Sequence, residues 1–496
     1  MRRLESCRSS YHAQVPSPAT DPLPHADAIA TADAANAAPA ASSLERYHGL
    51  LWLVAAAFFM QSLDSTVVNT AVPAMADALK ETPLGMRSAL TSYVLTLAIL
   101  IPASPWLCDR FGTRRVFGAA IVLFGLGSLL CGVSQTLPQL VAARVLQGVG
   151  GASLMPVGRY VLVRSIDKRE FVRAMSTVAT FGLLGSVLGP LLGGALVEYT
   201  SWRLIFLVNV PVAIAGLWMN RRDMPEYRLE HANRFDFAGF LLFAAASALL
   251  LAASELAGVD PVPWPSMAAC TGIALLLGVL YVWHSRRTAH PVAELSLLRV
   301  RSVWVALAGG LFTRLGIAGM FLLLVLFLQV GCGWSPLAAG LMMVPQALGS
   351  IAAKWVINRA LMHLGYRRLL LGNTLMVALL LAAFALFGAG TPAWVIATFT
   401  FVYGAFTGLQ YTAMNTLIYA DLDIRHASMA SSMASTAQYL AMSFGIALST
   451  LLMQALLRGH APHDFVVAFR WTVLLLAAIT AAASRLFGQL RDSRQA

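Results

Sequence analysis

Charged side chains are scarce in this sequence: they make up 12% of its 496 residues, whereas hydrophobic residues make up 58%. Soluble domains contain roughly 25% charged and 45–50% hydrophobic residues. The composition therefore excludes a soluble protein. Cysteine is also rare, and the five cysteines are scattered without the spacing of a metal site or a disulfide framework. We therefore expect no metal centre and interpret the cysteines as packing residues.

Motifs of catalysis are missing as well. The sequence contains no nucleotide-binding P-loop, no metal-ligand cluster and no catalytic triad. A membrane enzyme would need polar catalytic residues clustered at one depth, and a sensor would need a signalling domain, for which the tail and the loops are too short. We therefore expect neither an enzyme nor a sensor. No cofactor is predicted, and the energy for any work must come from an ion gradient.

Long apolar runs dominate what is present. A helix needs about 20 apolar residues to cross a bilayer. Fourteen runs of roughly this length occur, at about 49–73, 84–107, 115–134, 137–158, 174–197, 203–220, 236–256, 265–283, 303–328, 337–357, 367–388, 393–418, 428–456 and 466–487. The sequence therefore predicts an all-α integral membrane protein with fourteen transmembrane helices and the lipid bilayer as its surroundings.

The charge balance is basic, with 35 Lys and Arg against 23 Asp and Glu and a formal net charge of +12. The basic residues are not spread over one surface as in nucleic-acid-binding proteins. They gather in alternate loops, at 110–115, 164–173, 221–234, 286–301 and 359–368. Cytoplasmic loops of membrane proteins carry this excess. We therefore expect no nucleic-acid partner, and we predict that both termini are cytoplasmic.

The chain also divides into regions. Residues 1–45 are rich in Ala, Pro, Ser and Asp and lack the apolar core of a cleavable signal, which predicts a disordered cytoplasmic tail. Two basic loops share a Gly-x-Arg-Arg pattern that aligns Gly112 with Gly365, as expected for two parallel repeats. We predict an N-terminal half of six helices at 46–222, two linker transmembrane helices at 223–300, and a C-terminal half of six helices at 301–490.

Four segments carry the most specific motifs of the chain: 63–73 (LDSTVVNTAVP), 144–152 (RVLQGVGGA), 182–196 (GLLGSVLGPLLGGAL) and 202–211 (WRLIFLVNVP). With these motifs, the sequence from about residue 46 to 490 resembles the major facilitator superfamily. Within it, the sequence is similar to the fourteen-helix drug:proton antiporters of the EmrB/QacA type, and most similar in texture to the MdtD-like subgroup. In that family the loop motif at 105–115 usually begins with glycine, where this chain has Pro105.

The resemblance implies the major facilitator fold, with two six-helix halves and two additional central helices. It also implies proton-coupled antiport that exports amphipathic drugs or toxic small molecules across a bacterial-type inner membrane. Export of an organic anion or a metal chelate is the alternative. A membrane-fusion partner that carries the product onward is implied by the family analogy alone.

The segment 182–196 combines glycine and proline inside an apolar run, at Gly185, Gly189, Pro190, Gly193 and Gly194. Proline removes a helical hydrogen bond, and glycine removes the side chain that would keep a neighbouring helix away. The spacing resembles the antiporter motif of helix 5, which is associated with exporters. The other interpretation is an ordinary packing face of small residues.

Asp64 and Arg144 are the charges that we expect deepest in the membrane. Asp64 lies on an outward-running helix, about 21 Å from the inner face of the membrane. Arg144 lies on an inward-running helix, about 12 Å from the outer face. In a core about 30 Å thick these depths nearly coincide. A paired carboxylate stays ionised, whereas a separated, desolvated acid takes up a proton. We predict a proton-coupling pair; a static ion pair that only orients the two helices is the alternative.

The first basic loop contains Asp109, Arg110, Gly112, Arg114 and Arg115. We predict that it is a cytoplasmic gate, which latches helix ends through charge pairs and releases them when the halves rock. A role in topology alone is the other interpretation. The acid and the turn glycine favour the gate, because orientation requires neither.

Arg314 is expected about 20 Å into a helix that contains no acid. An unpaired cation in a membrane must face a water-filled cavity, an acid on another helix or an anionic substrate group. We assign Arg314, Gln61, Gln346 and Tyr411 to the substrate site. Three other charged residues lie near span ends, where side chains can reach water, and we expect no special role for them: Glu198, Glu255 and Lys354.

Overall fold

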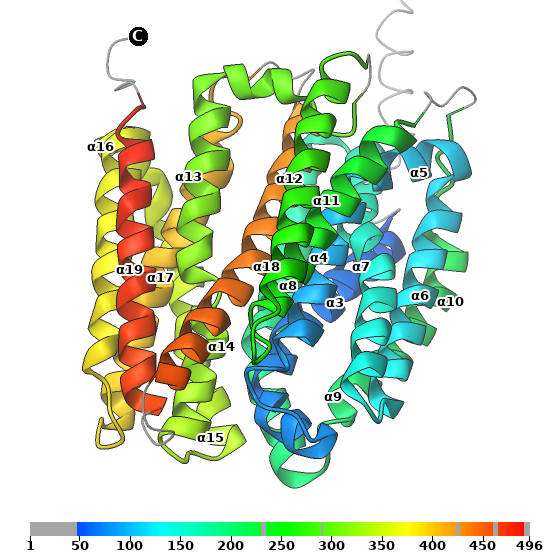
Figure 1. Ribbon diagram of the computed structural model, residues 1–496. Coiled ribbons are helices and arrows are strands. Elements are labelled where there is room, and N and C mark those ends of the chain that lie inside the picture. Colours follow the sequence, from blue (N-terminus) through cyan, green and yellow to red (C-terminus); the bar gives the residue numbers. More distant parts are fainter. Residues whose placement is uncertain (1–46, 230–234, 289–290, 423–426, 460–464, 491–496) are drawn as a thin grey trace, which may run out of the picture.

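The computed structural model describes residues 47–229, 235–288, 291–422, 427–459 and 465–490, and every regular element in these ranges is a helix (Figure 1). The tail predicted at 1–45 lies outside the described residues. Within them, 13 helices are long and apolar enough to cross a membrane. One of these, Pro336–Leu386, has 51 residues. At 1.5 Å per residue it would be about 77 Å long, more than twice the roughly 30 Å of a bilayer core.

This long helix consists of two crossings joined by a turn. Gly365 interrupts it with φ 69° and ψ 168°, a backbone conformation that glycine adopts readily. The described residues therefore contain the fourteen crossings that hydropathy predicts. Gly112, which aligns with Gly365 in the sequence, has φ 90° and ψ 149° and separates two helices in the same way. The shared Gly-x-Arg-Arg pattern thus corresponds to a shared turn geometry.

The first group of helices, here called the N bundle, is coloured blue to green-cyan in Figure 1. It contains α3 (His48–Leu79), α4 (Arg87–Leu100), α5 (Ser104–Phe111), α6 (Thr113–Val133), α7 (Leu137–Ser165), α8 (Lys168–Tyr199), α9 (Leu204–Leu207) and α10 (Asn209–Asp223). α4 and α5 form one crossing that a 3-10 turn at Ile101–Ala103 interrupts. Pro102 and Pro105 lack the N–H groups that would continue the helical ladder there.

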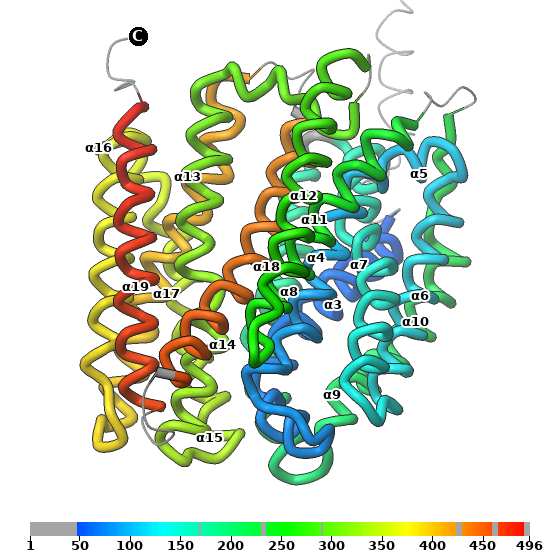
Figure 2. The backbone as a smooth tube through the Cα atoms, viewed as in Figure 1, coloured from blue at the N-terminus to red at the C-terminus, as the bar shows by residue number. Residues whose placement is uncertain are grey.

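The second group, the C bundle, is coloured light green to red. It contains α13 (Arg301–Ile317), α14 (Met320–Leu326), α15 (Pro336–Leu341), α16 (Val344–Ala383), α17 (Ala393–Leu417), α18 (Ala427–Gly459) and α19 (Phe465–Phe487). Figure 2 shows the two bundles as neighbouring sets of near-antiparallel helices.

Between the bundles in sequence comes the linker hairpin, α11 (Phe237–Leu256) and α12 (Trp264–Ser285), whose helices pack against each other. Only 22% and 11% of their most apolar windows are buried, compared with 67% in α3. The hairpin therefore lies on the periphery, where α11 contacts α4 and α18. In Figure 1 it crosses the front of the molecule.

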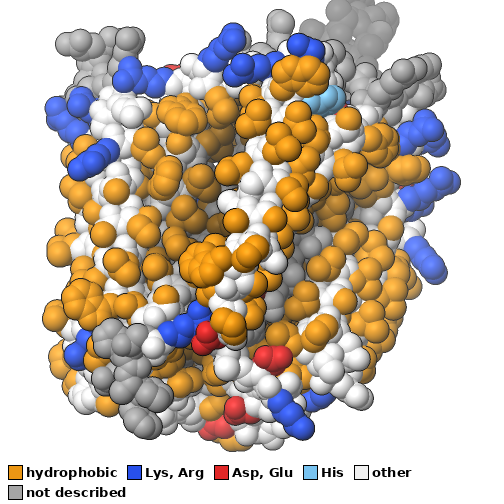
Figure 3. Space-filling view, viewed as in Figure 1, with side chains coloured by type: hydrophobic (Ala, Val, Ile, Leu, Met, Phe, Trp, Pro, Cys, Tyr) orange, Lys and Arg blue, Asp and Glu red, His pale blue; other side chains and the backbone are white. Residues whose placement is uncertain are grey.

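The two ends of the molecule differ in charge. We call the end that carries the 109–115 loop and the turn at Gly365 the basic end, and the opposite end the far end. Figure 3 shows Lys and Arg side chains gathered along the basic end, at the top of the view, and acidic side chains near the far end.

The apolar core is shared at one end and divided at the other. Near the far end, one continuous core joins residues of both bundles, such as Met75 and Leu324. Toward the basic end there are two cores: one is built almost entirely from the N bundle around Phe117, and one from the C bundle around Leu370. Figure 3 shows the surface hollowed between the C bundle and the linker hairpin. The structure is therefore closed at the far end.

Candidate functional site

Asp64 and Arg144 meet inside the N bundle. Arg144 Nη1 lies 2.7 Å from Asp64 Oδ2, and the two side chains are 2% and 0% exposed. The guanidinium also donates to the carbonyl of Ala89 and lies 4.0 Å over the ring of Tyr93. Because α3 and α7 run in opposite directions, residues at different distances from their helix starts reach the same depth. The structure therefore places the two charges in direct contact.

A polar network completes the surroundings of the carboxylate. Asp64 Oδ1 accepts hydrogen bonds from Gln147 at 2.8 Å and from Asn209 at 3.2 Å. Both amides also donate to the hydroxyl of Ser128, at 3.3 and 3.1 Å. Gln147 and Asn209 lie within the motifs 144–152 and 202–211, but no role was assigned to them from the sequence. The signal that could have found them is their amide chemistry inside two otherwise apolar spans.

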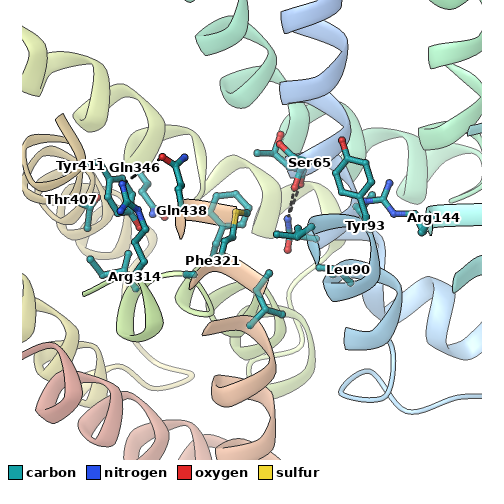
Figure 4. A pocket seen from close by; sticks show the side chains of 18 of the residues that line it. Ser65, Leu90, Tyr93, Arg144, Arg314, Phe321, Gln346, Thr407, Tyr411 and Gln438 are labelled. Atoms are coloured by element: carbon teal, nitrogen blue, oxygen red, sulfur yellow. Dashed lines mark hydrogen bonds between the residues drawn. The ribbon is translucent and has the colours of Figure 1, made fainter. Parts of the chain in front are cut away.

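A cavity of about 260 Å³ lies between the two bundles. Its lining contains Ser65, Thr66, Asn69, Tyr93 and Arg144 from the N bundle and Arg314, Gln346, Tyr411, Asn415 and Gln438 from the C bundle. Arg144 lies at one side of the cavity beside Tyr93, and Arg314 lies at the opposite side (Figure 4). Asp64 is not a lining residue, but its partner Arg144 and the neighbouring Tyr93 are. The ion pair thus faces the cavity with its cationic partner.

Arg314 is 7% exposed and has neutral partners in the structure. Its Nη2 donates to Asn415 Oδ1 at 3.1 Å and to Gln438 Oε1 at 3.4 Å, and its guanidinium lies 5.2 Å from the Tyr411 ring centre. Among the described residues no carboxylate forms an ion pair with it, and none lines the cavity. The cavity therefore contains one cation that no acid in the described chain balances.

Gln346 and Tyr411 line the cavity together with Arg314, as assigned, but Gln61 does not. Gln61 lies one helical turn before Ser65 on α3, is 3% exposed, and its Oε1 has no hydrogen-bond partner within the described residues. The predicted face of α3 was correct, because Ser65 on that face lines the cavity, but the predicted depth was one helical turn away. Because Gln61 is buried and is not among the lining residues, its assignment to the cavity is corrected.

The glycines of 182–196 lie at two contacts of α8. A Cβ on Gly185 would be 2.5 Å from the carbonyl oxygen of Phe59, and a Cβ on Gly189 or Gly193 would overlap the hydroxyls of Thr66 or Thr70. This face of α8 therefore packs directly on α3. On another face, a Cβ on Gly194 would lie 2.6 Å from the Pro336 carbonyl oxygen.

Pro190 lies at the second of these contacts. Its carbonyl would be overlapped by a Cβ on Gly340, so backbone meets backbone where α8 reaches the C bundle. α8 remains one helix across Pro190. The motif thus joins α8 to both α3 and the start of the C bundle.

The 109–115 loop is held by the segment that follows α10. Arg114 Nε donates to the Met224 carbonyl at 2.7 Å, and Thr113 Oγ1 donates to the Pro225 carbonyl at 2.7 Å. Tyr160 donates to Asp109 Oδ1 at 3.1 Å, and a Cβ on Gly112 would overlap the carboxylate of Glu226.

Arg110 and Arg115 are exposed. The contacts found for the loop in the described residues stay within the N bundle and its exit segment, and none reaches the C bundle.

Two of the three span-end residues have specific partners. Glu255 forms an ion pair with Arg87 at 3.1 Å, and Glu198 Oε2 accepts from the Leu337 N–H at 3.0 Å. Glu198 is nevertheless exposed, whereas Glu255 is only partly exposed because it pairs with Arg87, and each lies where two parts of the molecule meet. Lys354 is exposed.

Two helical bundles around a central cavity lined by polar and apolar side chains, with a closed far end and an ion pair buried beside the cavity, define a membrane transporter of the alternating-access class. The chain belongs to the Major Facilitator Superfamily, whose family model matches residues 54–446. It is therefore a multi-pass membrane transporter and not an enzyme.

Curated relatives are similar along nearly the whole chain. The multidrug resistance protein MdtD of Cronobacter sakazakii is 41% identical over 452 residues, covering 89% of this chain and 94% of that protein. The protein of the same name from Serratia proteamaculans is 40% identical over 459 residues, covering 89% and 93%.

Solved structures share the fold at low identity. A D-xylose-proton symporter matches with a TM-score of 0.64 and 15% identity, over 90% of this chain and 98% of that one. An inward-facing, occupied bacterial homologue of the lysosomal transporter Spinster matches with a TM-score of 0.61 and 14% identity, over 89% and 96%. The major facilitator fold predicted from the sequence is confirmed.

The contact between α8 and α3 generates the first prediction. Gly189→Leu places a side chain where Thr66 lies, and overpacking of this kind typically costs about 1–3 kcal/mol. We expect binding of a transported dye to persist while its transport rate falls at least about tenfold. Transport would be measured in vesicles and normalised to folded protein. Gly272→Leu is the matched control, since nothing lies within 4 Å of a Cβ there. Normal transport by Gly189→Leu would reduce the motif to ordinary packing.

Proposed function

We propose that this protein is a proton-coupled antiporter that exports amphipathic drugs or other toxic small molecules from the cytoplasm. The observation that carries the proposal is the Asp64–Arg144 pair at the wall of the central cavity. The names of the MdtD relatives, at about 41% identity, support multidrug export. Transport of this kind needs no cofactor, since the proton gradient supplies the energy.

The proposed orientation places the basic end in the cytoplasm of a cell with an inner membrane. Basic loops are retained on the cytoplasmic side during insertion. We assign residues 46–222 to the N-terminal half, 223–300 to the linker helices and 301–490 to the C-terminal half, with 1–45 as a cytoplasmic tail. In this orientation the closed far end faces outward and the cavity is in its cytoplasm-facing stage. A membrane-fusion partner remains a family analogy.

Proton coupling follows from the surroundings of Asp64. In the closed-far-end state the carboxylate accepts hydrogen bonds from three side chains: Arg144, Gln147 and Asn209. When the far end opens and Asp64 separates from Arg144 in a water-poor site, a proton from the outer side replaces the lost charge on the carboxylate. Return to the closed-far-end state restores the Asp64–Arg144 pair and releases that proton toward the cytoplasm. Protons therefore move inward in the same cycle that moves substrate outward.

The remaining motifs have supporting roles in this cycle. The α8 glycines bring α3, which carries Asp64, into contact with the C bundle through α8. The loop residues Asp109, Arg110, Gly112, Arg114 and Arg115 act as the cytoplasmic gate. Their contacts with 224–229 favour a gate that works through the segment leading into the linker hairpin.

The coupling role predicts that Asp64→Asn abolishes transport driven by a pH gradient. The asparagine keeps an oxygen acceptor and the side-chain size but cannot exchange a proton. The assay is uptake of a panel of dyes and drugs by inverted vesicles with an imposed pH gradient, with substrate exchange at equal pH measured in parallel.

Ser128→Ala is the matched control, because it removes two acceptor contacts of the same network without removing a titratable group. We expect this variant to retain gradient-driven transport and to lose about 1 kcal/mol of stability. Undiminished gradient-driven transport by Asp64→Asn would show that another group carries the proton.

The orientation predicts that reporters fused after residue 30 and after residue 492 both remain in the cytoplasm. Two reporters would be compared at both positions: one that is active only inside the cell and one that is active only outside it. An external reporter at either position contradicts the proposed direction of transport.

Arg314 favours a second candidate function, the export of an organic anion or a metal chelate. Its guanidinium faces the cavity and is bound only by neutral groups among the described residues. An anionic substrate group would supply the missing charge. Cationic drugs would gain nothing from this residue.

This alternative predicts that Arg314→Gln weakens export of anionic substrates selectively. Losing a charge-assisted hydrogen bond costs about 1.5–3 kcal/mol, or roughly ten- to hundredfold in apparent affinity. The apparent KM for one anionic and one cationic substrate would be measured side by side, normalised to folded protein. An equal loss for both substrates would remove the anion-binding role and leave drug export standing.

A further inference from the structure

A third buried cation, Arg87, joins three parts of the chain at the far end. Arg87 is the first residue of α4, and its side chain is 4% exposed. Its Nε lies 3.1 Å from Glu255 Oε2 at the end of α11, and its Nη1 lies 3.0 Å from Gln454 Oε1 on α18. The N bundle, the linker hairpin and the C bundle therefore meet at one guanidinium.

The guanidinium of Arg87 lies against the C-terminus of α11. Its Nη2 donates to the carbonyls of Ser254 and Glu255, at 3.5 and 3.2 Å. The carbonyl end of a helix is its negative pole, and a cation there is stabilised. Gly258 leaves the space that this arrangement needs, because a Cβ at that position would overlap the guanidinium.

The C bundle binds the same turn. Gln454 Nε2 and Arg458 Nη2 donate to the Gly258 carbonyl, at 2.8 and 2.6 Å. Nearby, the Ser443 hydroxyl donates to the Thr91 carbonyl at 3.1 Å, which brings α18 directly against α4. The end of α11 thus fills the junction of α4 and α18 and is bonded to both.

Opening the far end requires α4 and α18 to separate, since they belong to different bundles. Either the contacts of Arg87 with α11 must then break, or the contacts of Gln454 and Arg458 with the Gly258 carbonyl must break. Glu255 Oε1 has no partner among the described residues, so the ion pair is only partly satisfied in the closed state. An incompletely satisfied pair at a moving junction suits a contact that forms and breaks in each cycle.

We propose that the end of α11 is the latch of the far-end gate, so that the linker hairpin has a conformational function in addition to spanning the membrane. Arg87, Glu255, Gly258 and Gln454 form the latch. In the closed state it holds α4 to α18, and its release favours the far-open state. The inference rests on the alternating access that the proposed export requires, but it is independent of the substrate and of the coupling ion.

The test measures opening of the far end directly. Thr70 is 0% exposed, and its methyl group faces Gly340 of the C bundle, on the side of the far end where α8 meets α15. The reporter is Thr70→Cys in a full-length chain whose native cysteines are replaced by alanine. Its thiol reacts with a charged methanethiosulfonate only when the bundles separate. The labelling rate of purified, folded protein would be followed by mass spectrometry.

Two latch variants act by different means. Glu255→Gln removes the charge and keeps the size, whereas Gly258→Ala keeps every charge and fills the place of the guanidinium. We expect each to raise the labelling rate of the Thr70→Cys thiol severalfold, because the population of the far-open state increases. If one variant fails to fold, the other still tests the latch.

Asp236→Asn is the matched control, since it removes a carboxylate from the other end of the same hairpin, where Asp236 pairs with His284 at 2.7 Å. Parent-like labelling in both latch variants would overturn the proposal, and so would an equal rise in Asp236→Asn. The labelling assay needs no transport. A chain that shows the latch response but no gradient-driven export would therefore contradict the proposed function and leave the latch intact.

Discussion

The pairing of Arg144 with Asp64 is the interaction on which the rest of the N bundle depends. The two side chains are only 2% and 0% exposed, and removing one partner of such a buried pair typically costs about 3–5 kcal/mol because the other stays buried and uncompensated. The cost is avoided by contributions from several helices: α3 and α7 supply the charges, α7 and α10 supply amides, and α6 supplies the Ser128 hydroxyl. The arrangement of these helices therefore depends on pairing and hydrogen bonding of the buried charges as well as on apolar packing.

The C bundle also contains a buried cation, but it stabilises this cation with partners of a different kind. Arg314 is nearly as buried as Arg144, but its partners are neutral amides and an aromatic ring. The two guanidinium groups lie at opposite sides of one cavity, and within the described part of the chain only Arg144 is paired with a carboxylate. The cavity is consequently asymmetric in charge, which is a property that a pseudo-symmetric pair of bundles does not by itself supply. It distinguishes the two walls that an occupant would contact.

Much of this arrangement is predictable from the sequence. Hydropathy located the spans, because a bilayer leaves few alternatives to an apolar helix. Depth along the chain was enough to bring Asp64 near Arg144. Depth alone could not show that Ser65 lines the cavity and that Gln61, one helical turn earlier, does not. Nor could it reveal Arg87 and Glu255, which are separated by 168 positions and meet only because the linker hairpin lies against α4 and α18. Contacts between distant segments require the packing of whole helices, which periodicity does not contain.

The division of the apolar core has a thermodynamic consequence. The cores near the basic end stay within single bundles as the bundles rock, so a side chain lost there changes the free energy of unfolding equally in every conformation. The shared core at the far end exists only while that end is closed. Apolar contacts in that region therefore contribute to the equilibrium between conformations as well as to folding. Selection for faster transport would therefore weaken the apolar contacts of the shared core at the far end and leave the packing of the other two cores unchanged.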